Sequence, residues 1–324
     1  MISRVVRMVV GGLMWIGCAT TGPPNSPPQL DQPITLETES GAIHGSLNLP
    51  GSPAPVPVAM IIAGSGPTTR DGNVQGMPGN DAYRQLAEAL AERGIASVRY
   101  DKRGIGESAP AAPSEADLRF EHYVDDAADW IRMLADDSRF SQVTVIGHSE
   151  GSLIGMIAAR EAGADAFVSI AGVARKASDI LRDQLRPSLP AALMEQSEEI
   201  LRELDAGETV EGVPGELFAL FRPSVQPYLI SWFRYEPTAE IAQLDIPVLI
   251  VHGTTDVQVP VAEAEALAEA AKNARVQIIE GMNHVLKPVS GSVAEQQSSY
   301  FDPALPVAPE LVTAVADFVG EVAR

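Results

Sequence analysis

The stretch 143–152, with the sequence VTVIGHSEGS, constrains the fold of this chain more than any other segment. A short run of β-branched residues leads directly into Gly147-His-Ser-Glu-Gly151, and a pattern of small residues typical of a packed helix follows over 152–160. A G-x-S-x-G turn between a strand and a helix is so sharp that its central residue, here Ser149, adopts a strained backbone conformation. Both glycines are needed because a side chain at either position would collide with the neighbouring strand or helix. The stretch therefore predicts an α/β unit that presents a serine hydroxyl, the geometry called a nucleophile elbow.

The size and composition of the chain fit one large α/β domain. It has 324 residues, 45% of them hydrophobic, which is enough for a single extensive core. Segments typical of strands and helices alternate along most of its length. The formal net charge is −20, from 43 acidic and 23 basic residues. Such a chain lacks the basic surface that neutralises phosphates, so we expect no nucleic-acid partner.

The cysteine and histidine content argues against a metal site. Cys18 is the only cysteine, so neither a disulfide framework nor a cluster of thiolate ligands can form. The five histidines show no H-E-x-x-H spacing, the pattern of a zinc hydrolase. We therefore expect chemistry that uses side chains alone, without a metal or an organic cofactor.

The first residues have the pattern of an export signal rather than of a folded element. Arg4 and Arg7 precede an apolar run over 8–16 that is too short for a stable membrane-spanning helix. The run ends in Trp15-Ile-Gly-Cys18, which is similar to the lipobox of bacterial lipoproteins, although leucine is usual at the position of Trp15. We expect residues 1–17 to be a signal peptide of the lipoprotein type.

In this interpretation Cys18 carries a lipid at the new N-terminus, and the Pro-rich segment 18–33 is a tether that holds the domain away from a surface. Two alternatives are ordinary cleavage after Ala19 and retention of the segment as an uncleaved anchor. We expect export to the bacterial cell envelope, with the lipid on Cys18 as the only contact with a membrane, or otherwise a periplasmic or secreted protein.

The segment 34–175 is predicted to be the first part of the α/β core. Residues 34–40 and 42–49 alternate in polarity around Ser40-Gly41, which indicates an antiparallel hairpin. Apolar runs typical of strands buried on both faces then alternate with helical patterns. The expected strands cover 58–63, 95–100, 143–146 and 166–170, and the expected helices begin near Tyr83, at Phe120 and at Ser152.

The segment 176–236 breaks this alternation. It is charged and rich in helical patterns, and it contains no run typical of a buried strand, so we expect a helical cap inserted over the sheet. Regular order returns in 237–324, the second part of the core. Strands are expected over 247–251 and 276–279, and helices over 261–272 and 309–322. Repeated strand–helix–strand units predict a doubly wound, mostly parallel sheet.

Two further side chains complete a pattern for acyl transfer. Asp256 ends the segment His252-Gly-Thr-Thr-Asp256, directly after the strand expected over 247–251, and His284 ends Glu280-Gly-Met-Asn-His284, after the strand over 276–279. Open α/β sheets place their sites at the carboxyl ends of strands. Ser149 is therefore the candidate nucleophile, His284 the base and Asp256 the acid that orients it, in the order Ser…Asp…His that this fold imposes.

A tetrahedral intermediate also needs hydrogen-bond donors for its oxyanion. One candidate is the backbone N–H of Glu150, the residue after the nucleophile. The second is the N–H of Ser65, in the Gly-rich loop that follows the strand expected over 58–63. Loss of one such donor typically costs about 10²–10³ in rate.

These motifs resemble the α/β-hydrolase superfamily, in the branch described as serine aminopeptidase-like (S33) or dienelactone hydrolase-like, many members of which are carboxylesterases. The resemblance covers about residues 34–324. It rests on GSGPTTRDGN over 64–73, YDKRGIGES over 100–108, the elbow, the segment ending in Asp256, and Asn283-His284. It implies an α/β-hydrolase fold, a Ser149–Asp256–His284 triad and a cap formed by 176–236. The long stretch 287–308 before the last helix departs from the family pattern and is a candidate rim of the site.

Several other residues near these motifs have a structural interpretation. We expect His148 to pack beside the elbow, His252 to cap the end of its strand, and Asp101 and Arg103 to take part in structural ion pairing. The carboxylate of Glu150 suits the positive end of the elbow helix, although it is also placed to pair with a cationic group of a substrate.

Two further groups have less defined roles. Arg70, Asp71 and Asn73 either stabilise their own loop or line the pocket, and the sequence does not separate the two. The aromatic residues Tyr228, Trp232 and Phe233 are expected to form the core of the cap rather than a wall for the acyl group.

Together these observations predict an exported serine hydrolase, of the carboxylesterase type, that acts on small or medium uncharged acyl esters. One alternative is a serine peptidase of the aminopeptidase or acyl-peptide hydrolase type that uses the same triad. An aminopeptidase needs an acidic anchor for the ammonium group of its substrate. Another alternative is a non-catalytic envelope lipoprotein that uses the fold for binding.

Overall fold

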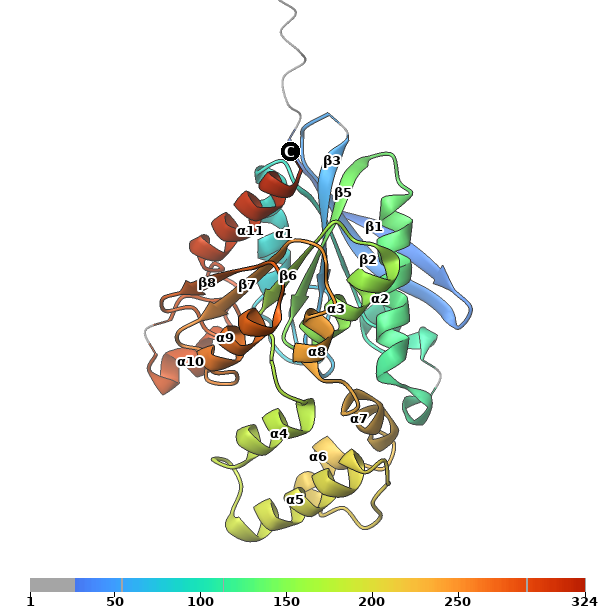
Figure 1. Ribbon diagram of the computed structural model, residues 1–324, viewed down its shortest axis with the longest axis vertical. Helices are drawn as coiled ribbons and strands as arrows, with labels where there is room; N and C mark the ends of the chain where they lie inside the picture. The colour runs from blue at the N-terminus through green and yellow to red at the C-terminus, as the bar shows by residue number, and fades with distance from the viewer. Residues whose placement is uncertain (1–26, 54, 113, 290, 324) are drawn as a thin grey trace, which may run out of the picture.

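The computed structural model of the protein describes residues 27–53, 55–112, 114–289 and 291–323 (Figure 1). The predicted signal peptide, Cys18 and the first part of the predicted tether lie outside the described residues.

The described residues form one eight-stranded sheet with the order β1-β2-β4-β3-β5-β6-β7-β8. The hairpin of β1 and β2 is antiparallel and pairs with β4, and from β4 through β3 to β8 neighbouring strands are parallel. This architecture is the α/β-hydrolase fold that the motifs predicted. The strands are β1 Gln29–Thr38, β2 Gly41–Leu49, β3 Val56–Ile62, β4 Ala96–Tyr100, β5 Phe140–His148, β6 Ala166–Ile170, β7 Val248–Gly253 and β8 Ala274–Ile279.

The first strand begins earlier than the sequence suggested. Residues 29–33 were expected in the tether, but they belong to β1, where Gln32 lies opposite Leu47 and Pro33 opposite Ser46. The reason is that backbone pairing with β2 extends the strand. Proline is tolerated at this position because β1 is an edge strand, so one of its sides needs no ladder hydrogen bonds.

Helices cover both faces of the sheet. On one face lie α2 Phe120–Ala135, α3 Glu150–Ala162, α8 Pro237–Ile241 and α9 Val261–Ala270, and on the other lie α1 Ala82–Glu92 and α11 Pro309–Val322 (Figure 1). Strand β3 is continuously apolar because both of its faces are buried. Val58, Met60 and Ile62 pack toward the first face, while Ala59 and Ile61 pack toward the second.

A group of helices stands beyond the carboxyl end of the parallel strands (Figure 1). The helices are α4 Ala177–Leu185, α5 Ala191–Asp205, α6 Phe218–Phe221 and α7 Gln226–Trp232, so the segment expected to be helical is helical. Leu201 and Leu204 of α5 are buried in the same apolar cluster as Phe221 and Leu229. This shared core holds the four helices together as a cap.

Short elements without a strong sequence pattern complete the described structure. They are the 3₁₀ helices η1 Gly106–Ala111, η2 Glu115–Asp117 and η3 Gly215–Leu217, and the helix α10 Val293–Ser299. Within the part of the chain that the structure describes, no helix has both the length and the apolar character needed to span a membrane.

Candidate active site

Ser149 occupies the turn between β5, which ends at His148, and α3, which begins at Glu150. Its backbone has φ 53° and ψ −120°, a region that residues other than glycine rarely adopt. Two backbone hydrogen bonds maintain this conformation, from Ser149 N–H to the Ile170 carbonyl (2.9 Å) and from Ser152 N–H to the Ser149 carbonyl (2.9 Å). The predicted nucleophile elbow is therefore present in the structure.

The two glycines of the motif have no room for a side chain. A Cβ atom at Gly147 would lie 2.2 Å from the carbonyl oxygen of Gly151, and one at Gly151 would lie 2.4 Å from the carbonyl oxygen of Ile62. These contacts join β5 to the elbow helix and the elbow helix to the end of β3. The collision predicted from the sequence is therefore confirmed at both positions.

Asp256 lies in the loop after β7, and its side chain is buried. Its Oδ1 accepts hydrogen bonds from the backbone N–H groups of Gln258 (2.8 Å) and Val259 (2.9 Å), and its Oδ2 lies 2.7 Å from Nδ1 of His284. Burial opposes ionisation of Asp256, but His284 and the two N–H groups outweigh it and hold the pKa of this carboxyl below its usual value. The side chain is therefore an ionised acceptor at neutral pH.

His284 lies in the loop after β8 and faces this acceptor. Because the Asp256 carboxylate accepts, Nδ1 of His284 carries the proton and Nε2 of the neutral ring is free to act as a base. Among the described residues, no hydrogen bond joins the Ser149 hydroxyl to the His284 ring, although the ring of His148, next to Ser149, lies 4.8 Å from that of His284 between centroids. Catalytic hydrogen bonds of this kind often tighten only when substrate binds.

His148 links the elbow to the loop of His284. Its Nε2 lies 2.9 Å from the carbonyl oxygen of His284 and its Nδ1 lies 2.7 Å from the hydroxyl of Tyr83. Burial lowers the pKa of His148 to about 3, so the ring is neutral. A carbonyl only accepts, so Nε2 donates and Nδ1 accepts from Tyr83. The expected packing role beside the elbow is confirmed, and the contacts add a positioning role.

His252 supports the loop of Asp256. Its Nε2 donates to the carbonyl oxygen of Val259 (2.8 Å), and burial lowers its pKa, so the ring is neutral. This contact closes the loop that begins at the end of β7, in agreement with the expected capping role.

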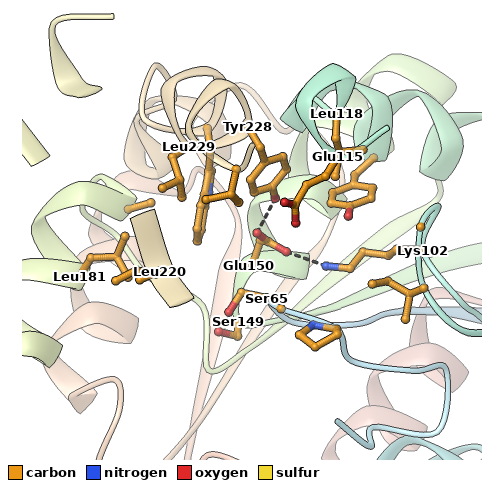
Figure 2. Close-up of a pocket in the computed structure, with 18 of the residues that line it drawn as sticks. Ser65, Lys102, Glu115, Leu118, Ser149, Glu150, Leu181, Leu220, Tyr228 and Leu229 are labelled. Atoms are coloured by element: carbon orange, nitrogen blue, oxygen red, sulfur yellow. Dashed lines mark hydrogen bonds and ion pairs between the residues drawn. The ribbon is translucent and has the colours of Figure 1, made fainter. Parts of the chain in front are cut away.

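The loop after β3 brings Ser65 next to the elbow. The Gly64 N–H donates to the Tyr83 hydroxyl (3.2 Å) and the Gly64 carbonyl accepts from Nζ of Lys102 (2.8 Å). Within the described ranges, the backbone N–H groups of Ser65 and Glu150 have no hydrogen-bond partner in the protein. Both residues line the same pocket as Ser149 (Figure 2). Two unpaired donors beside the candidate nucleophile are what an oxyanion hole requires.

The charged residues of the neighbouring loops are paired, in combinations that the sequence did not specify. Asp101 accepts from the backbone N–H of Arg70 (2.8 Å) and forms an ion pair with its side chain (3.6 Å). Arg103 pairs with Asp126 instead, at 2.7 Å between Nε and Oδ2. Asp101 and Arg103 are thus both in structural ion pairs, but not with each other.

The loop residues whose role was left open stabilise their own loop. Asp71 pairs with Arg99 (2.9 Å), and Asn73 bonds to the Asp81 carboxylate (2.7 Å) and to the backbone N–H groups that follow it at 80 and 81. None of Arg70, Asp71 and Asn73 lines the pocket. The contacts therefore favour the structural interpretation for all three.

A pocket of about 480 Å³ opens at Ser149, between the carboxyl edge of the sheet and the cap (Figure 2). Its cap side is mostly apolar, with contributions from Ile180, Leu181, Leu220, Val225, Leu229 and Trp232. Of the aromatic residues assigned to the cap core, Tyr228 and Trp232 also line the pocket, whereas Phe233 is buried behind it. All three pack in or against the apolar cluster, as expected of core residues, but Tyr228 and Trp232 also form part of the pocket wall because α7 turns one face toward the cavity.

The charged side chains that line this pocket all have partners. Glu150 pairs with Lys102 (2.6 Å) and accepts from the Tyr228 hydroxyl, and Glu115 pairs with Arg222 (2.9 Å) and accepts from the Ser224 hydroxyl. Arg103 is held by Asp126, as described above. Among the described lining residues, no acidic group is left free to pair with a cationic part of a ligand.

Among the described residues of the stretch 287–308, which are 287–289 and 291–308, none lines the pocket, so the expectation that this stretch rims the site is wrong for them. Several of them contact the two loops instead. Gln296 donates to the Thr255 carbonyl (2.7 Å), the Tyr300 hydroxyl lies 2.6 Å from Nε2 of Gln258, and Asn283 donates to Ser299 (2.7 Å). The helix α10 thereby buttresses the loops that carry Asp256 and His284.

Lys102 and Tyr83 are site residues that sequence reasoning did not single out. Lys102 stands in the motif after the end of β4, where side chains reach the same edge of the sheet, and this position is a signal that was available. Tyr83 belongs to the apolar stripe of α1, which hides the role of its hydroxyl. Within the ranges that the structure describes, no three His, Cys, Asp or Glu side chains gather in a way that would hold a metal ion.

Comparisons with known proteins concern the fold and the family of the chain. Residues 80–205 match the family described as serine aminopeptidase, S33, and residues 233–308 match the family described as TAP-like protein. The chain is 28% identical over 247 residues to esterase EstD of Thermotoga maritima, an alignment that covers 75% of this chain and 58% of that protein. The chain therefore spans less than two thirds of the length of this relative.

Two further similarities extend the picture. A non-heme haloperoxidase of Rhodococcus erythropolis is 26% identical over 242 residues, which cover 60% of this chain and 77% of that protein. The solved structure of Est1E from Butyrivibrio proteoclasticus superimposes with a TM-score of 0.59 at 18% identity, over 90% of this chain and 98% of that one, and so shows the fold.

A strained elbow serine, an Asp–His pair and a cap, all at the carboxyl edge of a mostly parallel sheet, define an α/β hydrolase. The chain belongs to the α/β-hydrolase superfamily, in its serine aminopeptidase (S33) branch.

Proposed function

We propose that this protein is a serine hydrolase that cleaves carboxylic esters with uncharged, mainly apolar acyl groups. The observation that carries the proposal is the position of Ser149, held in the elbow where it opens onto a mostly apolar pocket. The hydrogen bond between Asp256 and His284, in the loops after β7 and β8, supports it. The names of two similar proteins, esterase EstD and Est1E, support the ester class.

In this mechanism Ser149 Oγ attacks the ester carbonyl while its proton passes to Nε2 of His284. Asp256 holds the proton on Nδ1 and stabilises the imidazolium that forms. The C–O bond to the alcohol then breaks, and the alcohol leaves with the proton that His284 returns. A water molecule, deprotonated by His284, attacks the acyl carbon, the bond to Ser149 Oγ breaks, and His284 returns the proton to Ser149 as the acid is released.

The negative charge of each tetrahedral intermediate falls on the former carbonyl oxygen. The backbone N–H groups of Ser65 and Glu150 are the proposed donors to this oxygen, since both are unpaired in the described structure and lie at the pocket. Such prearranged donors stabilise the transition state more than the ground state, which raises kcat.

The charge pattern of the pocket favours an ester over the substrate of an aminopeptidase. An aminopeptidase binds the ammonium group of its substrate with a free carboxylate, and the two acidic lining residues, Glu115 and Glu150, are both engaged in ion pairs. At Glu150, whose side chain is buried, a second cation would have to displace Lys102 or the Tyr228 hydroxyl, which is costly. At Glu115, which is exposed, it would compete with Arg222 and the Ser224 hydroxyl. We therefore expect neutral acyl groups.

The proposal is tested by a Ser149→Ala variant assayed against p-nitrophenyl esters of graded acyl length and against aminoacyl arylamides. The wild-type protein should hydrolyse the esters in preference to the arylamides, and the variant should lose this activity by a factor of about 10³ or more. A fluorophosphonate probe should label Ser149 of the wild type, located by peptide mass spectrometry. Full ester hydrolysis by the variant, or arylamides as the better substrates, would contradict the proposal. Absence of both labelling and turnover would instead support the alternative of a non-catalytic binding protein.

We also propose that the protein is exported to the bacterial envelope and that Cys18 carries a lipid, with cleavage after Ala19 as the alternative. The proposal rests on the charged and apolar pattern of residues 1–17 and on the position of the single cysteine.

A further inference from the structure

The side chain of Lys102 is buried and has three separate contacts. Its ammonium group donates to the carbonyl oxygen of Gly64 at 2.8 Å and to Oε2 of Glu150 at 2.6 Å, and it lies 4.7 Å from the centre of the Tyr123 ring. The ring face is a favourable site for a cation. Lys102 is thus held in one place by an ion pair, a backbone carbonyl and an aromatic ring.

The contact with Gly64 fixes the orientation of the first proposed oxyanion donor. The carbonyl of Gly64 and the N–H of Ser65 belong to the same peptide group, which is planar and, when trans, points the two in opposite directions. Holding the carbonyl toward Lys102 therefore turns the Ser65 N–H away from it. The Gly64 N–H is fixed as well, by the Tyr83 hydroxyl, so both peptide groups that flank Gly64 are anchored.

The contact with Glu150 extends this arrangement to the second donor and to the cap. Glu150 supplies the other proposed oxyanion N–H, and its carboxylate is shared between Lys102 and the hydroxyl of Tyr228 in α7 (Figure 2). Burial raises the pKa of Tyr228 well above its usual value, so the phenol stays protonated and donates. A continuous series of contacts thus runs from the oxyanion loop through Lys102 and Glu150 to the cap.

We propose that Lys102, Glu150 and Tyr228 form a clamp of positioning residues that holds the two oxyanion donors in place and couples them to the position of the cap. The inference rests on the proposed function, because it assigns these residues a part in the same reaction. In the clamp, Lys102 also strengthens the Ser65 N–H as a donor, since a cation on a peptide carbonyl polarises the whole peptide group.

A purely structural ion pair makes a different prediction. If Lys102 and Glu150 serve only to neutralise each other, removal of both charges should restore whatever the removal of one charge disturbs. If Lys102 orients Gly64, the double variant should remain impaired, because the contact with the carbonyl is still missing. The double variant Lys102→Met/Glu150→Gln separates the two, since glutamine can still accept from Tyr228.

The experiment measures kcat and KM for p-nitrophenyl butyrate in Lys102→Met and in the double variant, with thermal unfolding as a check on folding. In both variants kcat is expected to fall by a factor of about 10–10³, while KM changes far less. The upper end of this range is the effect of removing one oxyanion donor completely. Arg99→Met is the matched control. Arg99 is an equally buried cation on β4, the strand that precedes Lys102, and pairs with Asp71 and Asp31, but it does not line the pocket. Its variant should lose stability and retain kcat.

Tyr228→Phe tests the cap end without altering charge. Removal of one hydrogen bond should lower kcat by a factor of about five. This variant also decides the matter if the double variant does not fold. Wild-type kcat in the folded double variant, or in Tyr228→Phe, would overturn the inference. Wild-type turnover that survives Ser149→Ala would contradict the proposed function itself, whereas a Ser149-dependent enzyme with fully active clamp variants would contradict the clamp alone.

Discussion

Replacement of Gly151 by alanine tests the physical basis of the elbow most directly. The added Cβ would lie 2.4 Å from the carbonyl oxygen of Ile62 and 2.7 Å from that of Ala63. Both atoms are backbone of the central strand β3 and its continuation, so neither can rotate away. The end of β3, or the start of α3, must move by several tenths of an ångström.

The cost follows from two opposing effects. Overpacking of this kind costs about 1–3 kcal/mol, while alanine in a helix gains at most about 1 kcal/mol over glycine. We therefore expect a net loss of up to about 2 kcal/mol in the free energy of unfolding. The effect on catalysis should be larger, because the segment that moves leads directly to Gly64 and Ser65, and a displacement near 1 Å can cost about 10² in rate.

The matched control is Gly320→Ala in α11. A Cβ at Gly320 meets no atom within 4 Å, so the same substitution should raise the free energy of unfolding by about 0.5–1 kcal/mol and leave kcat unchanged. Urea unfolding and turnover of p-nitrophenyl butyrate measure both quantities. A Gly151→Ala protein as stable and as active as the wild type would refute this account of the elbow.

Three further predictions concern separate parts of the molecule. The pKa of His148 is about 3 in the folded protein, against an ordinary value of 6.5. As the pH falls, this side chain therefore takes up a proton in the unfolded chain before it does so in the folded protein, and stability decreases below about pH 6.5. Between pH 7 and pH 5 this group should lower the free energy of unfolding of the wild type by about 2 kcal/mol. Urea titrations of His148→Gln should show a correspondingly flatter pH dependence. Parallel curves for the two proteins would argue against a buried neutral ring. Asp256→Asn should lower kcat for p-nitrophenyl butyrate by a factor of about 10⁴ with little change in KM. The reason is that an amide can stabilise the wrong tautomer of His284 and cannot stabilise the imidazolium. A loss of less than tenfold would remove Asp256 from the proposed triad. When the full chain is expressed in a bacterial host fed labelled palmitate, the protein should become labelled, whereas the Cys18→Ser variant should not. An unlabelled protein that begins after Ala19 would favour ordinary signal cleavage.

The parts of the fold that could be predicted from the sequence are those with a local pattern. The apolar runs of β3 and β6 and the amphipathic spacing of α2 are visible within windows of five to sixteen residues, and the structure places elements there with shifts of only a few residues. The strand β1 shows the limit of this approach. Its first residues look like a tether, and only backbone pairing with β2 makes them a strand.

The candidate site divides in the same way. The hydrogen bond between Asp256 and His284 was expected because both residues follow neighbouring parallel strands. The contacts of α10 with the two loops were not expected, because a short polar helix has no pattern that names the backbone it will meet. The partners of Asp101 and Arg103 were missed for a similar reason, since Arg70 and Asp126 stand 31 and 23 residues away from them in the chain.

The sequence by itself determined the alternation of strands and helices, the strained turn at Ser149 and the edge of the sheet at which Asp256 and His284 appear, because each depends on residues close together in the chain. Only the tertiary structure decided that Lys102 joins Gly64 to Glu150, that Tyr228 reaches them from the cap, and that α10 contacts the loop of Asp256. Those contacts link segments that are dozens of residues apart. The packing of whole helices and strands fixes the directions in which the loops at the sheet edge project, and these directions decide which contacts form. The local pattern of apolar and polar residues does not predict this packing.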